Sequence, residues 1–243
     1  MILVICGAGR NTRLKKYINY SKLLIKIDNE FLINHILNSV SIKEIKKIVI
    51  ILGYQSEKIK KAINKKFKKK ILFLKNNSYA STGNMYSLIL SEKIVRSNNL
   101  DVVWMNADNF ISSKIFKDFI LSSSKNILCD TGQKALFSQK DPVKIFIKNN
   151  RMIYIGKNLH KNFINGIAVG IYKLKRNDFF KYVYIANIIF RYFRKAGFIE
   201  PLKYLENQNL LVYKTKNFIW TDIDTFVDLK KSVKSILNYY KLQ

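Results

Sequence analysis

The sequence predicts an α/β fold: a single Rossmann-like domain with a mixed, mostly parallel sheet flanked by helices. In the first half, short apolar runs alternate with segments of helical periodicity, a pattern typical of parallel strands joined by crossover helices. After about residue 125, strand-like segments follow one another directly, so we expect the second half to be more antiparallel. No linker, internal repeat or low-complexity segment interrupts the 243 residues, which favours one domain spanning 1–243.

The elements of the first half follow from apolar periodicity. The segment 31–40 repeats its apolar residues on one helical face, and Ser56 is the predicted N-cap of the next helix. The runs 47–52 and 101–106 are almost wholly apolar, as buried parallel strands are. We predict strands at 1–6, 23–27, 47–52, 71–76 and 101–106, and helices at 31–40, 56–67 and 84–95.

The second half contains more strands and only two predicted helices. Asn149-Asn150 is expected to form a tight turn between two of the strands, and Pro142 and Pro201 stand where elements begin. We predict strands at 126–131, 142–148, 151–156, 166–174 and 210–216, and helices at 177–196 and 225–242.

The net charge of +28 is the most unusual property of the composition. Only seven of the 44 basic residues are arginine, and the lysines are spread along the whole chain. Since arginine is the preferred residue for bidentate phosphate and base contacts, we interpret the charge as compositional bias and expect no specific nucleic-acid partner. A weak attraction to nucleic acid or to an anionic membrane stays open, and the charge would help to steer in a polyanionic substrate.

One segment motivates a competing hypothesis, a nucleic-acid or anionic-membrane binding protein without catalysis. In residues 176–198, aromatic and aliphatic side chains stand among cations, as in helices that lie at a membrane interface. We favour the alternative that this helix contributes to the core or to a dimer contact.

The expected compartment is the cytoplasm. Cys6 and Cys129 are the only cysteines, too few for a disulfide framework, which favours a reducing environment. The apolar start is short and leads directly into a glycine turn, so we expect no signal peptide, and no apolar stretch approaches the ~20 residues that span a bilayer. The protein is expected to be a monomer or a homodimer.

The first predicted strand ends in the sequence GAGRNTR, which delivers arginines directly after a turn of small residues. In an open α/β sheet, ligands bind beyond the carboxyl ends of the strands. Gly7 and Gly9 would let backbone N–H groups approach phosphate oxygens, and Arg13 would add positive charge. Thr12 stands where a dinucleotide fingerprint has its third glycine, and the P-loop Gly-Lys-Ser/Thr is missing. Alone, the stretch could be an ordinary turn.

The stretch GAGRNTRL followed by SKLLIKI resembles the opening signature of the sugar-phosphate and phospho-alcohol nucleotidyltransferases, G-x-G-[TS]-R-L before Pro-Lys-x-Leu. The matching residues are Gly9, Thr12, Arg13, Leu14, Lys22 and Leu24. Asn11 replaces the second glycine, and because asparagine tolerates a positive φ the turn can survive. Ser21 replaces the proline, which costs rigidity, and Gly7 replaces an alanine.

Four further segments resemble the same family in the same order along the chain. They are GYQSEKIKKAI, NNSYASTGNMYSLILSE, MNADN and WTDIDTFVDLKKS. The second has the form found in phosphocholine-type cytidylyltransferases, where it is the nucleobase loop. The resemblance implies a GT-A-type fold with a nucleotide-binding half at 1–124 and an acceptor-binding half at 125–243.

The resemblance also implies roles for individual residues. Arg13, Lys22 and Asp108 are expected to be catalytic, with Arg13 and Lys22 holding the β- and γ-phosphates. The expected nucleotide-binding residues are Cys6, Gly7, Ala8, Gly9, Arg10, Asn11, Thr12, Arg13, Lys22, Gly53, Ser81, Thr82, Gly83 and Asn84. The expected acceptor-binding residues are Tyr86, Trp104, Asn109 and Lys157. The loop 81–84 could instead only cap the following helix, and in so basic a chain Lys157 could be an ordinary surface lysine.

Asp108, Asp222 and Asp224 are the expected ligands of a Mg²⁺ cofactor. Asp108 follows a buried strand, and residues two apart in an extended chain point the same way, so Asp222 and Asp224 can converge on one point. Carboxylates are the hard oxygen ligands that Mg²⁺ prefers. The alternatives are a solvated strand end for Asp108 and capping of the helix 225–242 for the other two.

The expected reaction joins CMP from CTP to a small phosphorylated alcohol or a phosphonate and releases pyrophosphate. The attacking oxygen is already ionised, because the second pKa of a phosphate is near ~6, so no general base is required. His35 and His160 therefore need no catalytic role. The alternative within the class is a sugar-1-phosphate nucleotidyltransferase that uses UTP, dTTP or GTP.

Overall fold

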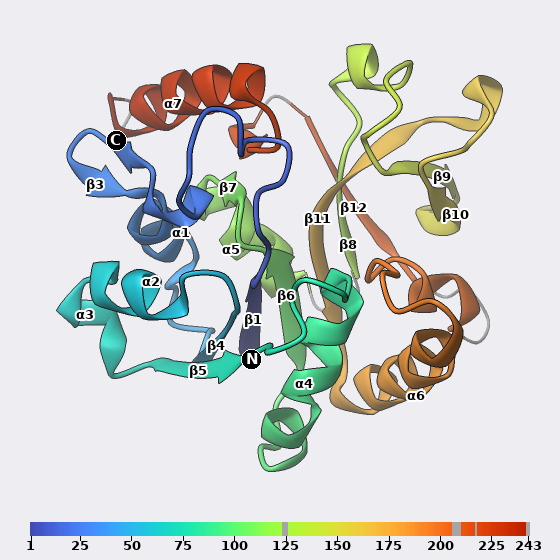
Figure 1. Ribbon diagram of the computed structural model, residues 1–243. Helices are drawn as coiled ribbons and strands as arrows, with labels where there is room; N and C mark the ends of the chain where they lie inside the picture. The colour runs from blue at the N-terminus through green and yellow to red at the C-terminus, as the bar shows by residue number, and fades with distance from the viewer. Residues whose placement is uncertain (123–125, 206–209, 217, 242–243) are drawn as a thin grey trace.

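A computed structural model describes residues 1–122, 126–205, 210–216 and 218–241 of the chain (Figure 1). The α-helices are α1 (Leu32–Val40), α2 (Ser56–Ala62), α3 (Lys65–Lys68), α4 (Asn84–Arg96), α5 (Ser113–Leu121), α6 (Arg176–Tyr192) and α7 (Phe226–Lys241). The 3₁₀ helices are η1 (Lys22–Leu24), η2 (Lys134–Leu136), η3 (Lys161–Phe163) and η4 (Pro201–Tyr204). The strands are β1 (Ile2–Gly7), β2 (Lys26–Ile27), β3 (Glu30–Phe31), β4 (Lys47–Leu52), β5 (Ile71–Lys75), β6 (Val102–Asn106), β7 (Asn109–Ile111), β8 (Ile127–Asp130), β9 (Lys144–Lys148), β10 (Arg151–Gly156), β11 (Gly166–Leu174), β12 (Val212–Thr215) and β13 (Trp220–Asp222).

One sheet of nine strands, counted over the described residues, forms the centre of the fold. Its main path is β10-β9-β11-β6-β1-β4-β5, with β8 pairing β11 and β12. The strands β6, β1, β4 and β5 are parallel, whereas β11 runs antiparallel to β6, β8 and β9. The predicted fold class is therefore confirmed, including the more antiparallel second half.

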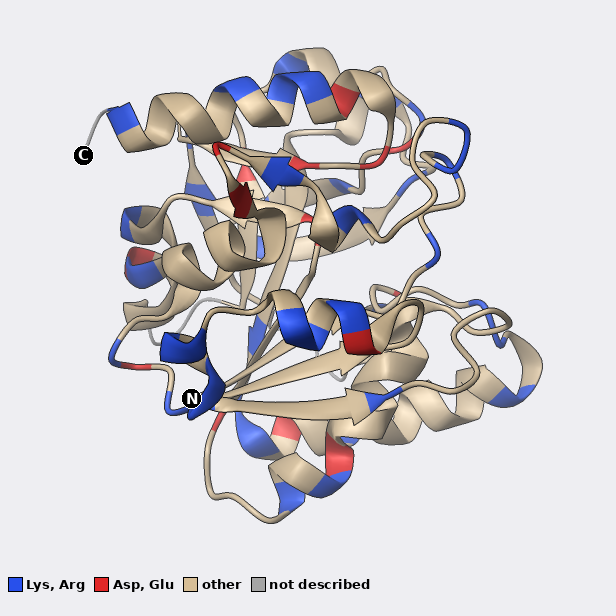
Figure 2. Cartoon of the chain, turned by 60° about the vertical axis from the view of Figure 1, so that its left-hand side comes forward, with Lys and Arg blue, Asp and Glu red and all other residues tan. Residues whose placement is uncertain are grey.

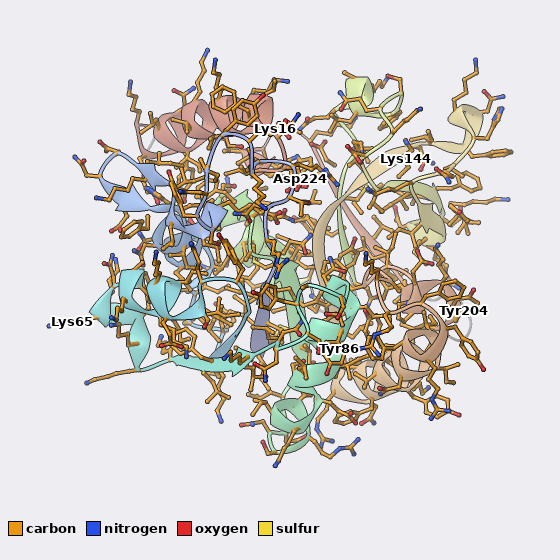
Figure 3. The ribbon with its side chains drawn as sticks, viewed as in Figure 1. Lys16, Lys65, Tyr86, Lys144, Tyr204 and Asp224 are labelled. Atoms are coloured by element: carbon orange, nitrogen blue, oxygen red, sulfur yellow. The ribbon has the colours of Figure 1, made fainter. Side chains whose placement is uncertain are left out.

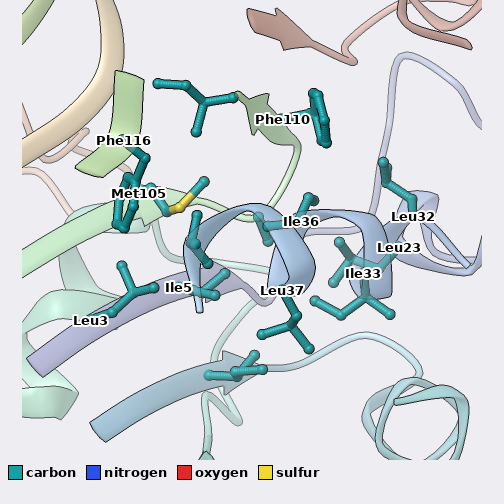
Figure 4. Close-up of a cluster of buried hydrophobic side chains, with 14 of the residues drawn as sticks. Leu3, Ile5, Leu23, Leu32, Ile33, Ile36, Leu37, Met105, Phe110 and Phe116 are labelled. Atoms are coloured by element: carbon teal, nitrogen blue, oxygen red, sulfur yellow. The ribbon is translucent and has the colours of Figure 1, made fainter. Parts of the chain in front are cut away.

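The alternation of apolar side chains along β1 and β4 covers both faces of the sheet. Leu3 and Ile5 belong to a cluster that also takes in the buried residues of α1, α2, α5 and α7 (Figure 4). Ile2 and Val4 point to the other face, where the buried residues of α4 and α6 pack. Since each of these strands is apolar on both faces, it reads as a continuous apolar run in the sequence.

Some expected elements differ from those observed. The predicted strand 23–27 is instead η1 followed by β2, and the predicted helix 56–67 is divided into α2 and α3. The division falls where the backbone N–H of Asn64 donates to Asn34 Oδ1 at 3.0 Å instead of continuing the helix. Ser56 is the first helical residue rather than the cap, because Gln55 holds the N-cap position with φ 53. Residue 242 of the predicted last helix lies outside the described residues.

The loop after β1 and the last helix, α7, meet above the sheet. The loop that leaves β1 rises towards α7 (Figure 1), and the ring of Tyr17 stacks on that of Phe226 with centroids 4.6 Å apart. Strand β13 pairs antiparallel with β7, which sets Asp222 opposite Asn109. Strand β13 therefore lies beside the carboxyl end of β6. Within the described residues, no helix has both the length and the apolar character needed to cross a bilayer.

Lysine and arginine residues occur in helices, strands and loops alike (Figure 2). The positive charge is thus spread over the fold as well as along the sequence. This distribution agrees with the interpretation of the charge as compositional.

Candidate active site

A pocket of about 270 Å³ lies at the carboxyl ends of β1 and β6. It is lined by Cys6, Gly7, Ala8, Gly9, Arg10, Asn11, Thr12, Arg13, Leu14, Ser21, Lys22, Leu23, Asn76, Tyr79, Thr82, Gly83, Asn84, Ser87, Asn106, Ala107, Asp108 and Asp224. The site therefore sits where an open α/β sheet binds its ligands. Most of the predicted nucleotide-binding residues, together with two of the predicted metal ligands, share this one pocket.

The turn after β1 is close-packed on one side and open on the other. A Cβ on Gly7 would lie 3.0 Å from the Leu23 side chain and 3.1 Å from that of Ala107, whereas one on Gly9 would meet no atom within 4 Å. Asn11 has φ 53, as expected for a residue that replaces a glycine in this turn. Gly53 lies behind the turn, where a Cβ would come within 2.7 Å of the Ala8 carbonyl oxygen. Space for a ligand therefore remains at Gly9.

Lys22 connects the pocket to the carboxylates. Its ammonium contacts the Asp108 carboxylate and donates to the Ile223 carbonyl at 2.7 Å and to Asp224 Oδ1 at 3.3 Å. Burial acts to lower the pKa of Lys22, but the charges of Asp108 and Asp224 outweigh it, so the pKa is raised above its usual value. Lys22 is therefore a fixed cation at the base of the pocket.

Arg13 lies at the other side of the same cluster. Its guanidinium donates to Asp224 Oδ2 at 2.8 Å and lies 3.6 Å from Asp141 Oδ2. The ammonium of Lys157 is 3.4 Å from the other oxygen of Asp141. Asp141 thus brings Lys157, from the turn after β10, close to Arg13. These are half-exposed ion pairs, which hold the side chains only loosely.

Asp108, Asp222 and Asp224 form a cluster of three carboxylates. Each offers an oxygen, and these oxygens all lie within 4.8 Å of one another. Asp108 Oδ1 is buried and has no hydrogen-bond partner among the residues that the structure describes, although such atoms are normally paired. Desolvation by the surrounding chain, followed by the charges of Asp108 and Asp224, raises the pKa of Asp222 well above its usual value, even though its side chain reaches the surface. An unpaired oxygen within a set of hard donors fits a divalent cation such as Mg²⁺.

The predicted nucleobase loop closes one wall of the pocket. Asn76 Nδ2 donates to Thr82 Oγ1 at 3.2 Å, and the Thr82 hydroxyl donates to the Ser78 carbonyl at 2.9 Å. A Cβ on Gly83 would lie 2.1 Å from the Ala196 carbonyl oxygen, so only glycine fits against that segment. Ser81 is exposed and lies outside the pocket lining.

Asn84 is held by two partners. It donates to Asn106 Oδ1 at 3.1 Å and accepts from the Phe198 backbone N–H at 2.9 Å. It orients Asn106 at the carboxyl end of β6. Its amide therefore has a structural role in addition to lining the pocket.

Three of the four predicted acceptor-binding residues pack against other parts of the chain and do not line the pocket. Trp104 is fully buried among aromatic rings, including those of Tyr172 and Tyr182, and belongs to the core. Asn109 is buried and donates to the Val169 carbonyl at 2.6 Å. Tyr86 stacks on Phe190 of α6 with centroids 4.6 Å apart, outside the pocket (Figure 3). The expectation that Trp104 or Tyr86 faces the acceptor is corrected accordingly. Trp104 shares a face of β6 with Asn106 but lies two residues further from the carboxyl end, where aromatic rings of the core cover it. Tyr86 lies on the side of α4 that packs against α6.

Several pocket residues were not predicted from the sequence: Ser21, Asn76, Tyr79, Ser87 and Asn106. The Arg10 guanidinium lies 5.2 Å from the centroid of the Tyr79 ring, at the mouth of the pocket. Asn76 and Asn106 each follow a predicted strand of the parallel sheet, and this position was the available signal. Cys6 also lines the pocket, where burial and then the Asp108 charge raise the pKa of its thiol.

The fold matches those of several solved nucleotidyltransferases. The inositol-1-phosphate CTP transferase of T. maritima matches with a TM-score of 0.79 at 16% identity, over 99% of this chain and 96% of that one. The CTP:phosphocholine cytidylyltransferase of Streptococcus pneumoniae matches with a TM-score of 0.69 at 17% identity, over 96% and 98%. A UTP-bound UGPase from Acinetobacter baumannii matches with a TM-score of 0.72 at 13% identity, over 100% and 94%. The fold is therefore that of the nucleotidyltransferases.

The chain belongs to the family described as "Domain of unknown function (DUF6564)", which matches residues 14–191. A curated relative, the choline-phosphate cytidylyltransferase of Streptococcus pneumoniae (strain ATCC BAA-255 / R6), is 30% identical over 126 residues. These residues make up 51% of this chain and 52% of the relative, so the chain spans about half the length of the curated relative that it matches. The predicted resemblance to nucleotidyltransferases close to the cytidylyltransferases is confirmed.

Proposed function

We propose that the protein is a Mg²⁺-dependent nucleotidyltransferase that joins CMP from CTP to a small phosphorylated alcohol or a phosphonate. The observation that carries the proposal is the contact of Lys22 with Asp108 and Asp224 at the base of the pocket. This contact places the Lys22 ammonium and the cluster of Asp108, Asp222 and Asp224 beside the turn after β1. The backbone of that turn is open to a ligand at Gly9. The sequence likeness to a cytidylyltransferase and the shared fold support the same class.

In the proposed reaction, an ionised oxygen of the acceptor attacks the α-phosphorus of CTP. A new P–O bond forms, the bond between the α-phosphorus and its bridging oxygen breaks, and pyrophosphate leaves with that oxygen. Since the nucleophile arrives ionised, no side chain has to remove a proton. The chain contributes position and charge, the two terms that dominate such a transfer.

Arg13 and Lys22 have the charge and position to bind the β- and γ-phosphates and to stabilise the leaving pyrophosphate. To do so, Arg13 would exchange its ion pair with Asp224 for phosphate oxygens, a low-cost change for a half-exposed pair. Asp108, Asp222 and Asp224 would hold Mg²⁺. When bound, Mg²⁺ supplies charge neutralisation at the phosphates.

The acceptor would enter on the side of Lys157 and Asp141. The side chain of Lys157 is 47% exposed, and it pairs with the carboxylate of Asp141, as Arg13 does. Lys157 can therefore reach an anionic group beside the phosphates. The aromatic residues Trp104 and Tyr86 are excluded from this role by their packing. A phosphate or phosphonate anion is thus the feature of the acceptor that these side chains suit.

Preference for CTP is the second part of the proposal. Cytosine differs from uracil in its amino group and ring nitrogen, so selection needs acceptors for the amino group. The candidates in the pocket are the Cys6 carbonyl, Thr82 Oγ1 and Asn106 Oδ1. Each already accepts one hydrogen bond and has a second lone pair for the amino group. A mismatched buried polar group costs roughly 1–3 kcal/mol, which is about 5- to 150-fold in affinity.

A uridylyl- or thymidylyltransferase of sugar 1-phosphates is the alternative. It is favoured by the fold match to UTP-bound UGPase. Pyrophosphate release measured with CTP, UTP, dTTP, GTP and ATP against phosphorylated alcohols, phosphonates and sugar 1-phosphates separates the two. We expect release with CTP and a non-sugar acceptor. Equal use of CTP and UTP, or preference for a purine nucleotide, contradicts the assignment as a cytidylyltransferase. If no combination of nucleotide and acceptor releases pyrophosphate, the assignment as a nucleotidyltransferase is contradicted.

A further inference from the structure

Helix α6 has two apolar sides, and only one of them is buried. Phe179, Tyr182, Val183 and Ala186 face the core. Tyr184, Ile188 and Tyr192 are spaced four residues apart, so they line up along the opposite side of the helix. Their exposed fractions are 70%, 43% and 77%, and that of Phe193, directly after the helix, is 69%. We name these four residues the aromatic face of α6.

Cations surround the aromatic face. Arg191, Arg194 and Lys195 are exposed at the end of the helix. From Phe179 to Ile199 the sequence contains four lysines and arginines and no carboxylate. Asp178 is the acidic residue of the helix, and it lies in the first turn, far from the cationic end. The surface thus combines an apolar stripe with a cluster of exposed cations at one end, Arg191, Arg194 and Lys195.

We propose that the aromatic face of α6 is a docking surface for an anionic lipid membrane, on which the helix lies without crossing it. A helix of this kind inserts its rings and aliphatic side chains at the headgroup boundary while its cations contact anionic headgroups. Tyr204, labelled in Figure 3, is a further exposed aromatic residue, 65% exposed on η4, which packs against α6. The proposal does not depend on the reaction proposed above.

Charge favours a membrane over a second copy of the chain. A two-fold contact joins the same patch of both copies, so a second copy would bring the same excess of positive charge to the contact. Such like-charge contacts are unfavourable, and the net charge of +28 adds to the repulsion. An anionic surface, in contrast, neutralises these cations. Single-stranded nucleic acid would also do so, but Ile188 at the centre of the stripe offers no ring on which a base can stack.

The test must not disturb the pocket, because the same segment supports it. The Gly83 N–H donates to the Arg194 carbonyl at 2.9 Å, so substitutions are confined to exposed side chains before that residue. The test variant is Tyr184→Ser/Tyr192→Ser. The matched control is Leu121→Ser/Phe163→Ser, which removes exposed apolar side chains, 56% and 51% exposed, from other parts of the fold.

Binding is measured by co-sedimentation with vesicles of mixed phosphatidylglycerol and phosphatidylcholine, and with vesicles of phosphatidylcholine alone, at physiological salt. We expect the wild type and the control variant to bind the anionic vesicles and to leave neutral ones in solution. The test variant should partition at least about tenfold more weakly. Thermal unfolding of both variants checks that they are folded, and pyrophosphate release checks the pocket separately.

Three results would overturn the proposal. Equal vesicle binding by the wild type and the test variant would mean that the general charge, and not this face, binds lipid. Dimerisation of the wild type that is lost in the test variant would assign the face to a second copy. Binding of single-stranded RNA that is weakened by the same two substitutions would assign it to nucleic acid.

Discussion

The indole N–H of Trp220 donates a hydrogen bond to Asp130 Oδ2 at 2.7 Å, which fastens the short strand β13 to the end of β8. The other oxygen of Asp130 accepts from the Gly132 N–H at 2.7 Å, so the buried carboxylate is held from two sides. Asp222 and Asp224 follow Trp220 directly. The hydrogen bond therefore fixes the backbone from which these two carboxylates extend.

We predict that Asp130→Ala and Trp220→Phe each lower turnover by about tenfold, the usual effect of removing a partner that orients metal ligands. The physical reason is the loss of an anchor for β13 rather than of a group that touches substrate. A double-mutant cycle, with the rate of pyrophosphate release as the readout, checks whether the Trp220–Asp130 hydrogen bond is this anchor. The double variant should be no worse than the worse single variant, because both changes break one interaction; additive losses would contradict this account.

The carboxylate cluster gives a second prediction. Asp108→Asn and Asp224→Asn keep the shape of the side chain and remove its charge, so each should lower turnover by at least about 100-fold while the protein stays folded. Steady-state pyrophosphate release at limiting Mg²⁺ measures turnover, and circular dichroism checks that the variants are folded. Glu57→Gln, which removes an exposed carboxylate paired with Lys60, serves as the control and should behave as the wild type. Unchanged turnover in either aspartate variant would refute the metal assignment.

Both thiols should react slowly with disulfide reagents at pH 8. Burial, followed by the charge of Asp130, raises the pKa of Cys129 to about 12, and burial with the charge of Asp108 raises the pKa of Cys6. Because the thiolate is the reactive form, we expect rates below about 1% of those for an unhindered cysteine. A chromogenic disulfide reagent, applied before and after denaturation, counts the protected thiols. Rapid labelling of Cys6 in the folded protein would contradict this prediction.

Lys173 gives a prediction about pH. Its ammonium is buried and donates to the carbonyls of Phe119, Ile120 and Ser122 at the end of α5, at 2.9, 3.1 and 2.8 Å. Desolvation, only partly opposed by Asp101, lowers the pKa of Lys173 to about 8. Between pH 8 and the unfolded value of 10.5 the unfolded chain binds more protons, so the free energy of unfolding should rise with pH across this window.

The control for this effect is Lys173→Met, because other lysines titrate over part of the same range. The difference in the free energy of unfolding between wild type and variant should shift in favour of the wild type as the pH rises from 8 to 10.5. Urea denaturation at several pH values measures it. A difference that is independent of pH would contradict a lowered pKa at Lys173.

The sequence was informative wherever the chain itself carries a local signal. The apolar runs located the central strands because those strands are buried on both faces, and Asn11 could be read as the replacement for a glycine. Strand β7 was not predicted, since it is short and pairs with the distant strand β13. Helix α5 was not predicted either, although it is as long as α1. The exposed side of α6 was also undetermined, because a pattern of apolar residues does not reveal which of them a neighbour covers.

The acceptor side could not be derived from the sequence for a similar reason. Trp104 and Asn109 stand next to the carboxyl end of β6 in sequence. Trp104 lies two residues before that end and is covered by aromatic rings of the core, and the turn before β7 directs Asn109 into the protein. Lys157 reaches the site only because Asp141 pairs with both Lys157 and Arg13. Contacts of this kind depend on the path of two loops, which composition and periodicity do not specify.

The ion pair between Arg13 and Asp224 joins residues that are 211 positions apart. During synthesis, the turn after β1 leaves the ribosome before the strand that carries Asp222 and Asp224. At ordinary translation rates the interval is on the order of ten to forty seconds. A nascent chain interrupted before Trp220 contains Arg13, Lys22 and Asp108 but lacks Asp222 and Asp224, so it cannot assemble the carboxylate cluster. The proposed enzyme would therefore gain its activity only after the segment that carries Asp222 and Asp224 has been translated.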